Sequence, residues 1–528
     1  MYFKMKAQFA PGGKPSSILR RQLARTACSL LMSAVAGTCW GQAGPGTRAL
    51  QLPLSGGQQA GVSSQQSATP AFSSSVNTLN SQVRVQGPFA GSVIDPNPPS
   101  GSLLLTLPEA VRRGLDFNLG KTGADAASKF AQAQRSAARS SLLPSISASL
   151  SENAAKADLQ AEGFNSSLFG GMQGVSFPST AGPFHYYDLH GSVQQNVVDF
   201  TAIHNYKSVR QLAEAAGLGA RQAREEVVLA VTGTYLQLMA TEALIDAQRA
   251  EVQYAEASFR QARAQADAGN KAPIDANRSQ VELQTEQQRL RSQQGDVQKQ
   301  KNALARLIGL PLSMEISITE KLEASSSDAA PIEEVLRRAW SQRQDLKAAE
   351  AQLRAAEEAR QAAGAERLPS VTVNGEYGIQ GVNPNSGNGV FQAAASLSIP
   401  IFSGGRIHAD AVQADSVVAE RRAELSNERG AVELDVRNAY IDLTVASDQV
   451  KTAASNRSLA LATLKQSQDR FAVGVADSVE VVNSQEALAF ADHDYVSSLF
   501  SQNLARIALA HAMGEAEKDL PELFKGSN

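Results

Sequence analysis

The chain has 528 residues, of which 5% are aromatic and 19% are charged, and its formal net charge is −3 at pH 7. A mean hydropathy of −0.23 excludes a protein made of many membrane-spanning helices. The scarcity of aromatic residues and the absence of a Walker loop, a GxSxG or HExxH motif and any His/Cys cluster disfavour an enzyme. We therefore expect no catalytic residue, no cofactor and no metal site.

Residues 1–43 are expected to be an export signal. Six basic residues and no acidic residue accompany the short apolar stretch "TACSLLMSAVAGTCWGQA", which contains both cysteines of the chain. Cleavage near Ala43 leaves 43 basic and 52 acidic residues, a net charge of −9 that argues against nucleic acid as a partner. The alternatives are a buried N-terminal helix and lipidation of Cys39, whose preceding residues fit a lipidation signal poorly.

The stretch after the signal, residues 44–101, is rich in Gly, Ser, Gln, Pro and Thr and shows no apolar period. Such a composition is typical of a disordered leader.

From residue 102 the chain uses one structural unit twice. Pro144 and Pro369 lie 225 positions apart in similar "LPS" sequences, whereas Gly269 and Gly474 lie 205 positions apart in similar glycine-centred breaks. Matches of this kind across both halves indicate an internal duplication. The predicted boundaries are unit 1 at 102–312, a connecting equatorial segment at 313–330, unit 2 at 331–515 and a C-terminal tail at 516–528.

Each unit is predicted to contain a helix, a strand pair, a very long helix, a break and a further helix. The strands are expected near 144–154, 185–199, 369–380 and 390–402. The loop between the strands is 23 residues longer in unit 1 than in unit 2, judged from the proline-to-phenylalanine spacing. Long, variable loops on strand pairs are typical of the outer side of a membrane β-barrel.

The long helices give a strong signal. Residues 203–267 contain no proline, and a helix of that length is about 100 Å long. In the following helix, apolar residues recur every seven positions, which indicates coiled-coil packing: Leu283, Leu290, Val297 and Leu304. Tyr235 and Tyr440 occupy matched positions on the two long helices, where we expect core packing.

Four strands cannot close a barrel with an interior, and an open sheet edge is not tolerated in lipid. Three chains supply twelve strands, an even number found in outer-membrane barrels. The sequence therefore predicts a mainly α fold with a membrane β-barrel. Duplicated helix-strand-strand-helix units form a long α-helical coiled-coil tunnel and a barrel shared by a homotrimer.

These features resemble the TolC family of bacterial outer-membrane efflux proteins. The resemblance covers residues 103–515 and rests on the duplicated unit, the "LPS" sequences, "IFSGG" at 401–405 and "RFAVGVADSVEVVNSQ" from Arg470. It implies a trimeric barrel in outer-membrane lipid, continued by a helical tunnel across the periplasm. It also implies passive conduction of drugs, metals or proteins from an inner-membrane transporter through a periplasmic adaptor protein.

In that family the two breaks are the helical turns at the periplasmic end of the tunnel, where the adaptor docks and the aperture closes. The residues that this implies for docking are Gly269, Asn270, Phe471, Val473, Gly474 and Val475. Those implied for the aperture are Glu480, Asn483 and Asp275. The gate tyrosine and arginine of better-studied members are replaced here by Phe471 and Ala476. A local helix-capping role for Glu480, with Asp477 as the cap, is an alternative compatible with the aperture.

Two other classes of protein remain as alternatives. A periplasmic adaptor also uses long helical hairpins, but it has one hairpin beside a small β-domain. A secreted coiled-coil structural protein explains the helices but not the strand pairs. The transported substrate is not predictable from the sequence.

Overall fold

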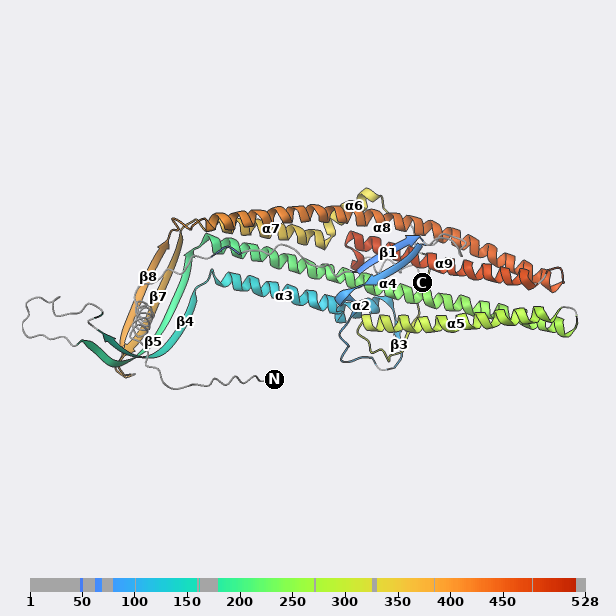
Figure 1. The fold of residues 1–528 in the computed structure, drawn as a ribbon, viewed down its shortest axis with the longest axis horizontal. Coiled ribbons are helices and arrows are strands. Elements are labelled where there is room, and N and C mark those ends of the chain that lie inside the picture. Colours follow the sequence, from blue (N-terminus) through green and yellow to red (C-terminus); the bar gives the residue numbers. More distant parts are fainter. Residues whose placement is uncertain are drawn as a thin grey trace, which may run out of the picture.

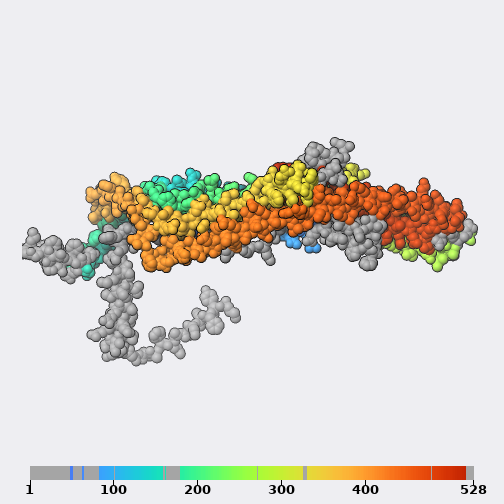
Figure 2. Space-filling model, turned by 90° about the horizontal axis from the view of Figure 1, so that it is seen from above, coloured from blue at the N-terminus to red at the C-terminus, as the bar shows by residue number. Residues whose placement is uncertain are grey.

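The structure is a computed structural model that describes residues 48–50, 62–68, 79–99, 101–158, 161, 179–269, 272–324, 330–383, 385–476 and 478–518. The predicted signal at 1–43, Asn270 and Asp477 lie outside these residues. Figure 1 shows an elongated molecule with a β-sheet at one end and two helical turns at the other. Figure 2 shows one long helix, α8, following a face of the molecule from the sheet toward the turns.

The sheet confirms the four predicted strands: β4 (Ser145–Asp158), β5 (Thr180–Val198), β7 (Ser370–Gly381) and β8 (Asn388–Ser398). Its order is β4-β5-β7-β8, and every pair is antiparallel. The strand pairs of the two units therefore meet at β5 and β7, where Val193 lies opposite Gly375. Large apolar side chains of the sheet are exposed in the single chain: Ile146, Leu150, Tyr377, Phe391 and Leu397.

The long helices confirm the predicted unit. Each unit has one very long helix and one shorter helix beyond the turn: α4 (Phe200–Asp267), α5 (Pro273–Leu307), α8 (Arg406–Ala472) and α9 (Ser478–Met513). The side chain of Asp199 accepts a hydrogen bond from the Ala202 N–H and so caps α4. In unit 2, Gly405 at φ +86° makes the same strand-to-helix bend.

The prediction of a single helix at the start of each unit is wrong, because two helices precede the strands in each unit. These helices also match between units. α2 (Leu107–Phe117) and α6 (Ile332–Gln342) each have 11 residues, and α3 (Leu119–Ser140) and α7 (Gln344–Ala365) each have 22. α4 packs against α3 and α5 of its own unit and against α7 and α9 of the other. Buried alanines on α7 allow a close approach: Ala348, Ala351, Ala355, Ala356, Ala359, Ala362 and Ala363.

The main hydrophobic core lies at the middle of the molecule, around α4. There β3 (Leu103–Leu105) pairs in parallel with β6 (Ile316–Ile318). Tyr235 is fully buried and donates a hydrogen bond of 3.0 Å to the carbonyl oxygen of Leu105, which confirms its core role. Among the described helices, α4 alone is long and apolar enough to cross a membrane by length and composition, and 67% of that apolar window is buried.

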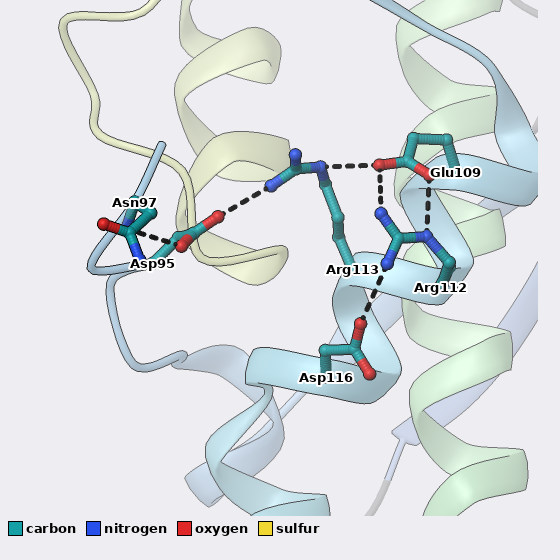
Figure 3. A network of polar contacts seen from close by, with 6 residues as sticks. All are labelled: Asp95, Asn97, Glu109, Arg112, Arg113 and Asp116. Atoms are coloured by element: carbon teal, nitrogen blue, oxygen red, sulfur yellow. Dashed lines mark hydrogen bonds and ion pairs between the residues drawn. The ribbon is translucent and has the colours of Figure 1, made fainter. Parts of the chain in front are cut away.

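A network of ion pairs fastens the segment before β3 to α2 (Figure 3). Arg113 contacts Asp95 at 3.2 Å and Glu109 at 2.9 Å. Arg112 contacts Glu109 at 2.7 Å and Asp116 at 3.2 Å. Hydrogen bonding to the Arg112 guanidinium lowers the pKa of the Glu109 carboxyl. Asp95, which lies outside the repeated unit, is thus held against it by charge.

The prediction of a disordered leader over 44–101 is wrong for the described part of that range. Residues Val62–Ala68 and Leu79–Val85 form an antiparallel hairpin, β1 and β2, which contacts α4 and α9. A few apolar side chains anchor it: Val62 is 7% exposed, and Val83 lies so near Gly233 that a Cβ there would be 2.4 Å from it. The composition of residues 44–101 is polar on average, so a few apolar residues that pack against helices do not stand out in it.

Residues 48–50 are attached near the sheet end of the helices. Arg48 pairs with Asp410 at 3.1 Å, and the N–H of Ala49 donates to Glu366 Oε1 at 2.6 Å. At the other end of the chain, Glu517 in the predicted tail pairs with Arg224 at 2.5 Å. The N-terminal end of the described chain is therefore attached to α8 and to the residue that follows α7. The C-terminal end is attached to α4.

Candidate functional site: the two helical turns

The α4–α5 and α8–α9 turns lie together at the end of the molecule opposite the sheet (Figure 1). Gly269 and Gly474 have φ values of +74° and +81°. Their N–H groups donate to Ala266 O at 3.0 Å and to Phe471 O at 3.1 Å. A residue with a Cβ costs about 1–2 kcal/mol in this left-handed conformation. Both turns therefore contain a left-handed glycine with the same backbone hydrogen bond, at the same place in the repeated unit.

The second turn combines a buried anchor with an exposed apolar tip. Phe471 is 2% exposed and packs in a small core with Leu464, Ala476, Val481 and Leu488. Val473 and Val475 are 75% and 70% exposed. Phe471 thus fixes the turn from inside, while the two valines present apolar surface at its tip.

Glu480 forms an ion pair across the second turn. Its Oε1 lies 3.2 Å from Nε of Arg470, at the end of α8. Glu480 also lies in the first turn of α9, where the helix dipole favours a negative charge. Asn483 is exposed one helical turn further along. Arg470 is not among the residues predicted from the sequence, although its place directly before Phe471 puts it opposite Glu480 across a hairpin.

The first turn has the same backbone but weaker anchoring. Ala266 replaces the buried aromatic residue and is only half-buried. Asp275 lies in the first turn of α5 and contacts Arg278 at 3.6 Å. The exposed apolar residue nearest this turn is Ile274, which is 62% exposed. The two turns are therefore alike in geometry but present different surfaces.

A four-stranded antiparallel sheet at one end and paired helical hairpins at the other define the class of outer-membrane efflux channels. The model of the outer membrane efflux protein family matches residues 123–310 and 335–515. The chain therefore belongs to this family, and its two matched stretches fall on the two repeated units. Because the chain belongs to this family, the two alternative classes, a periplasmic adaptor and a secreted structural protein, are excluded.

Similar proteins agree with this assignment. The toluene efflux pump outer membrane protein TtgF of Pseudomonas putida is 24% identical over 309 residues. That match covers 57% of this chain and spans 63% of the length of the relative.

Solved channels share the fold. The outer membrane protein VceC of Vibrio cholerae has a TM-score of 0.65 at 19% identity, covering 77% of this chain and 96% of VceC. The open state of the MtrE outer membrane channel of Neisseria gonorrhoeae has a TM-score of 0.65 at 17% identity, covering 88% of this chain and 98% of MtrE.

Proposed function

We propose that three copies of this chain form a passive outer-membrane duct. The duct conducts substrates from a periplasmic adaptor and an inner-membrane pump to the exterior. The observation that carries this proposal is a sheet with two open edges joined directly to two long helical hairpins. A single sheet cannot remain open in lipid, and helices of about 100 Å, such as α4 and α8, reach far beyond a membrane.

The trimer follows from the sheet edges. Each outer strand, β4 and β8, has one neighbour in the four-stranded sheet. Pairing β4 of one copy with β8 of the next closes twelve strands with three chains. Apolar residues along α8 are also exposed in the single chain and supply surface for a neighbouring copy: Val412, Leu434, Ile441, Leu459 and Leu461.

The test of this function is the state of the protein in mild detergent. We expect chemical crosslinking to give a trimer that retains its β content and that conducts ions when added to a planar bilayer. A stable monomer with full β content, or a trimer without conductance, contradicts the proposal.

The cargo is proposed to be set by the pump rather than by this chain. Toluene appears in the name of TtgF and describes that protein. A shared duct needs little substrate chemistry of its own, so we assign efflux to this chain without a particular substrate. Identification of the adaptor and pump that co-purify with it is the measurement that defines the cargo.

Glu480, Asn483 and Asp275 are proposed to line the periplasmic aperture. Three-fold symmetry repeats Glu480 around the tunnel axis near the turns, and a ring of carboxylates attracts cations. The Arg470 partner offsets part of this charge in the structure. Asn483, one helical turn further on, lines the same path without adding charge.

We expect Glu480→Gln to lower cation selectivity and to weaken block by divalent cations, because it removes the negative ring and leaves Arg470. Arg470→Gln is the matched variant, and it should raise cation selectivity by releasing the carboxylate. The measurement is the reversal potential across a planar bilayer under a salt gradient. An unchanged reversal potential combined with lower thermal stability in Glu480→Gln assigns Glu480 to helix capping instead.

A further inference from the structure

A buried carboxyl group lies where the two helical hairpins meet. Glu251 of α4 is 4% exposed, and its Oε1 has no hydrogen-bond partner. Gln485 of α9 is also 4% exposed, and neither polar atom of its amide has a partner. The space that they share is too small to admit a water molecule. Its walls come from α4, α5 and α9: Glu251, Ala255, Glu282, Glu286, Gln485, Glu486 and Ala489.

Negative groups outnumber positive groups around Glu251. α5 contributes Glu282, Glu286 and Arg289, α9 contributes Glu486 and Asp492, and α8 contributes Arg457. Each of the two arginines is already in an ion pair, Arg289 with Glu286 and Arg457 with Asp492. Within the described residues no group of acidic or histidine side chains could hold a metal ion. A proton is therefore the remaining means of neutralising Glu251.

The pKa values agree with this geometry. Burial, followed by the charges of Asp492, Glu286 and Glu282, raises the pKa of Glu251 to about 8. Burial and a hydrogen bond with Glu286 also raise the pKa of Glu282.

A comparison of the two repeated units shows that packing within a hairpin does not require carboxyl groups at these positions. At the offset of 205 that relates the two turns, Glu251 corresponds to Asn456. Glu282 and Glu286 correspond to Ala487 and Ala491. Unit 2 thus builds the same hairpin without carboxyl groups at these three positions. The acids of unit 1 are instead brought against α9 by contact between the two hairpins.

A cavity beside this cluster gives α9 room to move. It has a volume of about 600 Å³ and lies between α4, α8 and α9. Ala250 and Tyr254 line it from α4, and Leu488 and Asp492 line it from α9. The cavity can admit water beside Ala250, the residue before Glu251 in α4, and beside Asp492 of α9.

We propose that Glu251 is a proton-dependent latch between the two helical hairpins. With its carboxyl neutral, α9 packs against α4 and α5; with its carboxyl ionised, repulsion from Glu286, Glu282 and Asp492 moves α9 away. Because ionisation is disfavoured in the packed state, the stability of this contact is present at low pH and is lost as pH rises through the folded pKa. The effect on conduction, but not the latch itself, rests on the proposed channel function.

The first test measures thermal unfolding of the detergent-solubilised protein between pH 6 and pH 9.5, which requires no channel activity. Glu251 ionises at about pH 4.3 in an unfolded chain and only at about pH 8 in the folded one, so the folded state holds the extra proton between these values. We therefore expect the unfolding midpoint of the wild type to fall by about 3 °C or more between pH 6 and pH 8 and to level off above pH 8. Glu251→Gln should reduce this fall markedly, because an amide cannot ionise, and should leave only the part that Glu282 and other carboxyls contribute. Glu256→Gln, an exposed residue on the same helix, should leave the fall unchanged.

The second test measures bilayer conductance over the same pH range. The wild type is expected to open with a midpoint near pH 8, and Glu251→Gln is expected to stay at its low-pH conductance. A wild type whose unfolding midpoint does not depend on pH, or a Glu251→Gln variant that keeps the wild-type dependence, overturns the latch. A pH dependence of the midpoint that is markedly reduced in Glu251→Gln, in a protein that never conducts, supports the latch and refutes the channel.

Discussion

Replacing Val473 and Val475 together with aspartate is expected to abolish export while the trimer remains intact. Both valines are exposed at the tip of the second turn, so the change removes no packing within the chain. Two charges placed in an apolar contact must be desolvated when a partner binds, which should weaken docking at least about tenfold per residue. The measurement is export from living cells, together with capture of the adaptor by the purified trimer.

A matched control separates docking from a general effect of added charge. Gln466→Asp places one negative charge on an exposed position of α8 away from the turn, and export should be normal. Normal export by the valine double variant removes the docking surface from the proposal. Loss of the trimer in that variant shows instead that the turn acts in assembly.

Gly309→Ala is expected to destabilise the middle of the molecule strongly. Gly309 has a φ of +77°, and a Cβ there would lie 2.6 Å from Phe117 Cβ and 2.7 Å from the carbonyl oxygen of Val93. Left-handed backbone strain and overpacking together cost about 2–5 kcal/mol. The yield of folded protein and its unfolding midpoint should both fall, and circular dichroism during heating measures the latter.

Gly295→Ala is the control for this change. Gly295 lies inside α5, and a Cβ there meets nothing within 4 Å. Alanine favours a helix over glycine by about 1 kcal/mol, so the variant should be as stable as the wild type or more stable. Wild-type stability in Gly309→Ala contradicts the assigned backbone conformation.

Much of the fold could be predicted because its signals are local. Pro144 and Pro369 mark the ends of α3 and α7, and Gly269 and Gly474 mark the turns. Alternating β-branched residues after Pro369 predict β7 because a strand exposes alternate faces. These features depend on residues that are neighbours in sequence.

The remainder depends on residues that are distant in sequence. Glu251 acquires its environment from the register between α4 and α9, which no sequence period specifies. The β1–β2 hairpin could not be predicted for a similar reason. Val62 and Val83 stabilise it by packing against α4, which is more than 100 residues away in the sequence.

The β1–β2 hairpin imposes an order on folding. It rests on α4 and on α9, yet it is synthesised before either of them. Contacts between the two ends of a chain form slowly, because a long loop must close before they contribute any stability. The β1–β2 hairpin therefore docks only after α4 and α9 are in place. A partly folded chain leaves this hairpin open to proteases until α9 is in place.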